Sequence, residues 1–280
     1  MSARLGALVE LLRLPAALTV PGDTLAGAAA AGRVSRRAAV LPLASVSLYW
    51  AGMALNDWAD RDLDAVERPE RPIPSGRVAP GAALALAAGL TAGGVGIAAL
   101  AGGRRAAATA AVLSGVVWAY DTVLKESPAG PVAMAAARGL DVVLGAGGRP
   151  GAAVVPAAVM AGHTAGLTLL SRGEVHGTAR ATARAATAAT ALAAAGAAAR
   201  ARRPLPLALS LLYAGTVGRA QAAAVASPDA ATVRRATGAG IRGMIPLQAA
   251  LVARRSPVVA LGLLAAGPVA RAASRVVSPT

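Results

Sequence analysis

The chain has 280 residues and a formal net charge of +15, yet only 15% of its residues are charged and 56% are hydrophobic. Its mean hydropathy is +0.57, which excludes a disordered chain. The absence of Cys excludes disulfides, zinc–thiolate sites and thiol catalysis. A basic chain often binds nucleic acid, but 3 Trp and 3 Tyr are its only aromatic side chains. Because the Arg residues are also dispersed, we expect no nucleic-acid partner.

Apolar runs long enough to cross a bilayer recur along the whole chain. In chain order they cover residues 14–31, 38–56, 79–101, 105–120, 129–147, 152–170, 181–199, 204–222, 240–254 and 257–273. Arg254 and Arg255 interrupt the last apolar region, so the count is nine or ten spans. We therefore predict an all-α polytopic transmembrane helical bundle, formed by a single domain over residues 1–280.

The distribution of Arg between loops gives only a weak orientation signal, because both sides carry similar numbers. The order of the spans is more informative. Four predicted spans lie between the loop at 57–78 and the loop at 171–180, and four is an even number. These two loops are therefore expected on the same side of the membrane.

Acidic residues are scarce but clustered. Six of the 13 fall within fourteen positions, namely Asp57, Asp60, Asp62, Asp64, Glu67 and Glu70. If the second span continues as a helix, Asn56, Asp60 and Asp64 recur every four residues on one face. Carboxylates at this spacing repel each other, and Mg²⁺ is the hard cation that one or two carboxylates bind together with substrate phosphates. The cluster therefore predicts an Mg²⁺ site.

Basic residues follow the acidic cluster within the same loop, at Arg68, Arg71 and Arg77. Arg donates two parallel hydrogen bonds to phosphate, and the intervening prolines make the segment rigid. Two interpretations stay open at this point. The loop is either an Mg²⁺–diphosphate site or a solvated segment of mixed charge that anchors a helix end.

The pattern NDxxDxxxD at residues 56–64, followed by RxxRP at residues 68–72, resembles the first aspartate-rich motif of the UbiA superfamily of intramembrane prenyltransferases. The resemblance implies a helical bundle around a central cavity. It also implies an integral protein of a bacterial plasma membrane, with the active-site loops on the cytoplasmic side. By this resemblance the metal ligands are Asn56, Asp57, Asp60 and Asp64. Arg68 and Arg71 would bind the diphosphate.

The second motif of the family departs from its usual DxxxDxxxG pattern. Residues 171–177 read Ser-Arg-Gly-Glu-Val-His-Gly, with Glu174 as the single carboxylate. Glu174 either contributes to a second metal or forms an ion pair with Arg172, a candidate substrate-binding residue. This departure resembles the EboC-like branch of the superfamily.

Tyr120 and Lys125 follow the fourth span and resemble a diphosphate-contacting pair of the family, with one extra residue between them. The alternative for Lys125 is an interfacial lysine that extends its ammonium group to water. Within the fifth span, Arg138 and Asp141 lie three residues apart on one helix face. Such a pair predicts either a functional site or a structural salt bridge. Asp23 in the first span also needs a partner.

The expected reaction is Mg²⁺-dependent transfer of a prenyl group from a prenyl diphosphate to a small or lipid acceptor in the membrane. The candidate catalytic residues are Asp60, Asp64, Asp141 and Glu174, of which Asp141 or Glu174 would remove a proton from the acceptor. Candidates for substrate binding are Arg68, Arg71, Tyr120, Lys125, Arg138 and Arg172. Alternatives are a transporter or lipid-carrier-binding protein without transferase activity, and phosphoribosyl transfer to a lipid phosphate. The sequence indicates no obligate protein partner.

Overall fold

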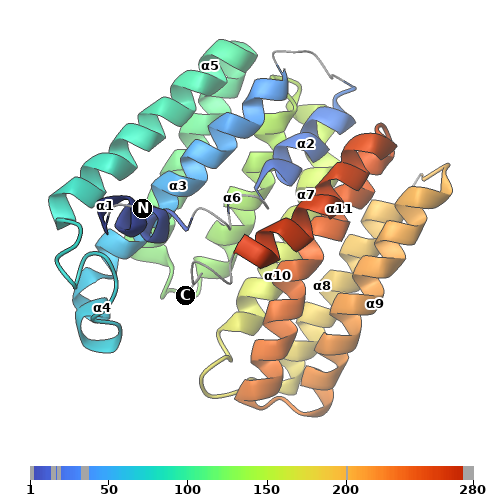
Figure 1. Cartoon of the computed structure of the whole chain (residues 1–280). Coiled ribbons are helices and arrows are strands. Elements are labelled where there is room, and N and C mark those ends of the chain that lie inside the picture. The colour runs from blue at the N-terminus through green and yellow to red at the C-terminus, as the bar shows by residue number, and fades with distance from the viewer. Residues whose placement is uncertain (1–2, 14–16, 18–19, 33–37, 200, 274–280) are drawn as a thin grey trace.

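The computed structural model describes residues 3–13, 17, 20–32, 38–199 and 201–273, and the regular structure within these ranges is helical. Figure 1 shows the helices side by side in an elongated bundle. The α-helices are α1 (Ala3–Leu11), α2 (Pro21–Ala30), α3 (Leu41–Ala59), α4 (Arg61–Glu67), α5 (Pro80–Ala119), α6 (Gly130–Gly145), α7 (Pro150–Ser171), α8 (Arg180–Ala198), α9 (Pro204–Ala226), α10 (Ala230–Ala253) and α11 (Pro257–Ala273).

The predicted apolar runs correspond to helices of the structure. The run at 14–31 coincides with α2 only in part, because residues 14–16 and 18–19 lie outside the described ranges. Among the described helices, the segments Pro80–Leu124 and Pro150–Ser171 are long and apolar enough to cross a membrane. The all-helical prediction is confirmed, whereas nine or ten bilayer crossings stay a prediction.

Helix α5 doubles back on itself at Gly103, where φ is 73° and ψ is −168°. The indole N–H of Trp118 donates to the hydroxyl of Thr91 at 3.1 Å, although 27 residues separate them. In a straight helix, that separation would correspond to about 40 Å. The two halves of α5 are therefore antiparallel, which agrees with the separate runs predicted at 79–101 and 105–120.

Gly103→Ala is expected to destabilise this reversal by about 1–3 kcal/mol, since an L side chain rarely adopts such a positive φ. A Cβ at Gly103 would meet nothing within 4 Å, so the cost is backbone strain alone. Gly115→Ala is the matched control, because that position is helical and equally open. Thermal unfolding in detergent should give a lower midpoint for Gly103→Ala only. Equal midpoints would contradict this account of the turn.

Helix α6 stands between two groups of helices. One cluster of buried apolar side chains joins it to α2, α7, α8, α9 and α10. Another joins it to α3 and both halves of α5. Side chains on one face of α6 therefore point toward α3 and α5, which is where the cavity described below lies.

The junction of α3 with α4, the connection from α5 to α6 and the connection from α7 to α8 meet at the end of the bundle that carries α4. The ammonium group of Lys125 forms an ion pair with Asp60, and a guanidinium N–H of Arg172 donates to the carbonyl oxygen of Lys125 at 3.4 Å. In Figure 1, α4 and the connection between α7 and α8 lie at this same end. The loops at 57–78 and 171–180 thus lie at the same end of the bundle, while their place on one side of a membrane stays a prediction.

Candidate metal and diphosphate site

The junction between α3 and α4 keeps three polar residues of the first motif on one side. Helix α3 ends at Ala59, and Asp60 (φ −89°, ψ 2°) bends the chain into α4. The amide of Asp60 still donates to the carbonyl of Asn56 at 2.9 Å, and that of Asp64 to Asp60 at 2.8 Å. The four-residue spacing therefore survives the bend. Asn56, Asp60 and Asp64 line one pocket of about 360 Å³ together with Arg13, Leu63, Glu67, Arg68 and Arg71.

Arginines neutralise the two most buried carboxylates of this motif. Arg71 donates to Asp64 at 2.8 Å and contacts Asp57 at 3.5 Å. Asp57 and Asp64 are only 4% and 3% exposed. Asp57 lies one residue beyond the predicted span 38–56, and burial raises its pKa while Arg13 and Arg71 lower it. Arg71 is therefore a structural partner of the motif as well as a candidate ligand of the diphosphate.

Arg13 belongs to the site, although no sequence motif assigns it there. Its guanidinium donates to Asp57 at 2.9 Å across 44 residues of sequence, and it lines the same pocket. The helix that precedes it is tied to the loop by an ion pair between Glu10 and Arg77 at 2.7 Å. The hydrogen bond from Arg77 to Glu10 raises the pKa of Arg77. No local spacing pattern could have identified Arg13, because its partner is remote in sequence.

The extra residue between Tyr120 and Lys125 is accommodated by a π-helix at Tyr120–Leu124. The amide of Lys125 donates to the carbonyl of Tyr120, five residues earlier, at 2.9 Å. A π-helical turn holds one more residue than an α-helical turn and is frequent at functional sites. The ammonium group of Lys125 consequently reaches Asp60, and this ion pair is partly exposed.

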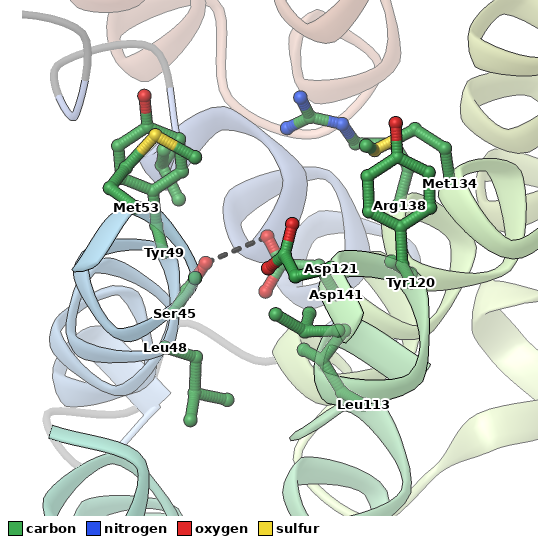
Figure 2. A pocket seen from close by; sticks show the side chains of 14 residues that line it. Ser45, Leu48, Tyr49, Met53, Leu113, Tyr120, Asp121, Met134, Arg138 and Asp141 are labelled. Carbon is green, nitrogen blue, oxygen red and sulfur yellow. Dashed lines mark hydrogen bonds between the residues drawn. The ribbon is translucent and has the colours of Figure 1, made fainter. Parts of the chain in front are cut away.

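A second cavity of about 150 Å³ lies between α3, α5 and α6. Figure 2 shows apolar side chains around it, among them Leu48, Met53, Leu113 and Met134, with Tyr120 at its edge. Asp121 also lines it and accepts a hydrogen bond from the amide of Asn56 at 3.4 Å. This contact connects the apolar cavity to the pocket of the aspartate motif.

Charged groups inside the bundle pair differently from the prediction. Arg138 donates to Asp23 on α2 at 2.6 Å, and the amide of Gln248 donates to the other oxygen of Asp23 at 2.9 Å. Asp141 instead accepts from the hydroxyl of Ser45 at 2.7 Å (Figure 2). Of the two interpretations of Arg138 and Asp141, the salt bridge between them is therefore wrong, because Arg138 reaches across to Asp23 on the neighbouring helix. Both residues line the apolar cavity.

The second motif lies beside the Lys125 segment rather than in either cavity. Arg172 donates to the carbonyl oxygens of Lys125 and Ser127. The backbone carbonyl of Glu174 accepts from Arg234 at 2.6 Å. Neither of the two cavities is lined by Arg172 or Glu174. A second metal held by Glu174 stays a prediction.

The first motif fits Mg²⁺ that is bound together with a diphosphate, but not a closed metal site. Within the described ranges, no group of three or more His, Asp or Glu side chains could hold a metal by itself. Mg²⁺ commonly needs only one or two carboxylates, completed by phosphates and water. Asp60 and Asp64 lie in the wall of the open pocket beside the amide of Asn56, with Arg68 close by. This donor set meets that requirement.

Residues 18–239 match the model of the UbiA prenyltransferase family. The chain belongs to this family. It is 40% identical over 109 residues to the digeranylgeranylglyceryl phosphate synthase of Methanopyrus kandleri. This alignment covers 39% of this chain and 38% of that protein. It is 35% identical over 168 residues to the enzyme of the same name from Methanothrix thermoacetophila, with 59% of each chain covered. The matches thus span less than two thirds of these relatives.

Solved structures of the UbiA family share the fold. A digeranylgeranylglyceryl phosphate synthase in membranes superposes with a TM-score of 0.71 at 17% identity, covering 90% of this chain and 98% of that one. A UbiA homologue from Aeropyrum pernix K1 gives 0.66 at 18% identity, with 85% and 96% covered. A homologue from Archaeoglobus fulgidus bound to DMAPP and Mg²⁺ gives 0.58 at 14% identity, with 85% and 98% covered. Membership of the UbiA family makes this chain an integral membrane protein.

Proposed function

We propose that this UbiA-family protein is an Mg²⁺-dependent prenyltransferase that moves a prenyl group from a prenyl diphosphate to a lipid-type acceptor. The observation that carries the proposal is the pocket in which Asn56, Asp60 and Asp64 face Arg68 and Arg71. Two comparisons support it. The homologue from Archaeoglobus fulgidus binds DMAPP and Mg²⁺, and the relatives from Methanopyrus kandleri and Methanothrix thermoacetophila are named for a glyceryl phosphate product.

Separate residues at the pocket would bind the metal and the diphosphate. Asp60 and Asp64, with Asn56, would hold Mg²⁺, which when bound stabilises negative charge on a leaving diphosphate. Arg68 and Arg71 would donate hydrogen bonds to the diphosphate oxygens, and Lys125 would add a third cation. Arg71 and Lys125 are held in place by Asp64 and Asp60 before the reaction, so they would stabilise the charge that develops as the C–O bond breaks.

The adjoining apolar cavity would shield the reacting carbon from water. As the bond from the prenyl carbon to the diphosphate oxygen breaks, its electron pair leaves with the diphosphate. The acceptor forms the new bond to that carbon and releases a proton to a carboxylate, for which Asp141 and Glu174 are the candidates. Asp141 lines the cavity, and one of its carboxylate oxygens has no hydrogen-bond partner among the described residues. Asp141 is therefore the stronger of the two candidates.

The membrane arrangement is part of the proposal. A single domain over residues 1–280 would cross a bacterial plasma membrane nine or ten times, with the aspartate-motif end on the cytoplasmic side, where prenyl diphosphates and Mg²⁺ are available. Assignment to the EboC-like branch rests on the single carboxylate of the second motif, Glu174.

An assay with purified protein in liposomes tests the function. The protein is incubated with labelled prenyl diphosphates of several chain lengths and a panel of acceptors. We expect diphosphate release and a labelled lipid product that both require Mg²⁺ and disappear on addition of EDTA. Release from phosphoribosyl diphosphate instead would assign phosphoribosyl transfer to a lipid phosphate. The absence of release from every donor would overturn the proposed activity and favour binding or transport.

Lys125→Gln is expected to raise KM for the prenyl diphosphate roughly 10- to 100-fold, since a hydrogen bond to a charged group contributes about 1.5–3 kcal/mol. The ion pair of Lys125 with Asp60 is partly exposed, so the unfolding temperature should stay close to that of the wild type. Steady-state kinetics with varied donor concentration measure the effect. An unchanged KM would remove Lys125 from the diphosphate site.

A further inference from the structure

Five segments lie at the end of the bundle opposite the aspartate motif. They are the described parts of the connections between helices, at residues 31–32 and 38–40, 146–149, 199 and 201–203, and 254–256, and the turn inside α5 at residues 102–105. Contacts across this end join them. A guanidinium N–H of Arg105 donates to the carbonyl of Gly148 at 3.4 Å, and one of Arg149 to Ala31 at 3.5 Å. Arg254 donates to Ala197 at 2.6 Å. In Figure 1 these segments lie away from α4, at the other end of the helices.

This end carries positive charge without any acidic residue. None of the 13 Asp and Glu of the chain lies in the five segments. Their Arg residues within the described ranges are Arg104, Arg105, Arg149, Arg202, Arg203, Arg254 and Arg255. Apart from Arg254, which is half-buried, all of these are exposed. None of the six exposed arginines forms an ion pair with another described residue.

The aspartate-motif end is different, because it carries acidic residues and several of its arginines pair with them. Arg13 and Arg71 pair with Asp57, and Arg77 pairs with Glu10. At the opposite end, like charges gather without counter-charges from the residues that the structure describes, and they repel one another unless anions bind there. The carbonyl contacts of Arg105 and Arg149 hold these side chains against the bundle rather than letting them extend separately into water. A guanidinium has five N–H donors, so one such contact leaves others for a further ligand.

We propose that this basic end, composed of Arg104, Arg105, Arg149, Arg202, Arg203 and Arg255, binds the phosphate groups of anionic phospholipids such as phosphatidylglycerol. Helix ends of an integral membrane protein lie at the depth of the lipid headgroups, where phosphate is the abundant anion. Arg binds phosphate through two parallel hydrogen bonds, so several arginines at this depth favour anionic lipids over neutral ones. The inference does not depend on prenyl transfer.

The proposal is tested with the full chain in nanodiscs of two compositions. One contains phosphatidylcholine alone, and the other contains phosphatidylcholine mixed with phosphatidylglycerol. Phosphatidylglycerol should raise the unfolding temperature of the wild type, and the rise should shrink as salt screens the charges. Native mass spectrometry should detect retained phosphatidylglycerol molecules. A variant with Arg104, Arg105, Arg202 and Arg203 changed to Gln should lose at least half of the retained lipid and of the temperature shift.

The matched control changes four exposed arginines outside the basic end to Gln, namely Arg180, Arg184, Arg219 and Arg235. It should retain phosphatidylglycerol like the wild type. The proposal is overturned if both variants lose lipid equally, or if the two lipid compositions give the same unfolding temperature. Sodium phosphate is added in a separate arm. If it reproduces the full shift in phosphatidylcholine alone, the end binds free anions rather than lipid.

Discussion

Asp60→Asn is expected to lower the rate of Mg²⁺-dependent diphosphate release on the order of 1,000-fold, because a metal stabilises the leaving group by several kcal/mol. The amide cannot replace the carboxylate as a charged ligand. The side chain of Asp60 is 22% exposed in the pocket and pairs with Lys125, so its replacement should leave the fold intact. Single-turnover measurements at saturating Mg²⁺ and donor would isolate the effect on the chemical step.

Asp62→Asn is the matched control for this experiment. Asp62 belongs to the same acidic cluster, but its side chain is 86% exposed and pairs only with Arg61 at the surface. Its rate should stay within about twofold of the wild type, since an exposed ion pair contributes little. Full activity of Asp60→Asn, measured beside an active wild type, would remove the first motif from the mechanism.

Gly145→Val is expected to prevent α2 from packing on α6 and to abolish the folded protein in detergent extracts. A Cβ on Gly145 would overlap the backbone of Thr24, and one on Gly27 would overlap the carbonyl oxygen of Val142. Backbone atoms cannot move aside as a flexible side chain can, so the helices would have to separate. Small residues at such crossings are what permit close packing of membrane helices.

Gly215→Val on α9 provides the control, because a Cβ there meets nothing within 4 Å. Size-exclusion profiles and thermal unfolding should show a single folded species for Gly215→Val and aggregated protein for Gly145→Val. The close crossing also brings Asp23 within reach of Arg138. A folded Gly145→Val protein with a wild-type unfolding temperature would show that the crossing is not required.

The sequence by itself determined the helical class, the approximate positions of α2, α3 and α5 to α11, and the residues of the first motif. These features follow from short-range regularities. Apolar runs of bilayer length predict helices, and Asn56, Asp60 and Asp64 share a face because backbone hydrogen bonds repeat every four residues. The sequence also shows the extra residue between Tyr120 and Lys125, but it does not predict the π-helix that accommodates this residue.

Only the tertiary structure decided the partners of the charged groups. Arg13 meets Asp57 across 44 residues, and Arg138 meets Asp23 across 115. The spacing of Arg138 and Asp141 suggested a local pair, but the close approach of α2 and α6 offers Arg138 a different carboxylate. The net charge was likewise evident from composition, while its concentration at one acid-free end depends on which helix connections the fold brings together. Such pairings depend on how helices pack, and no local spacing encodes them.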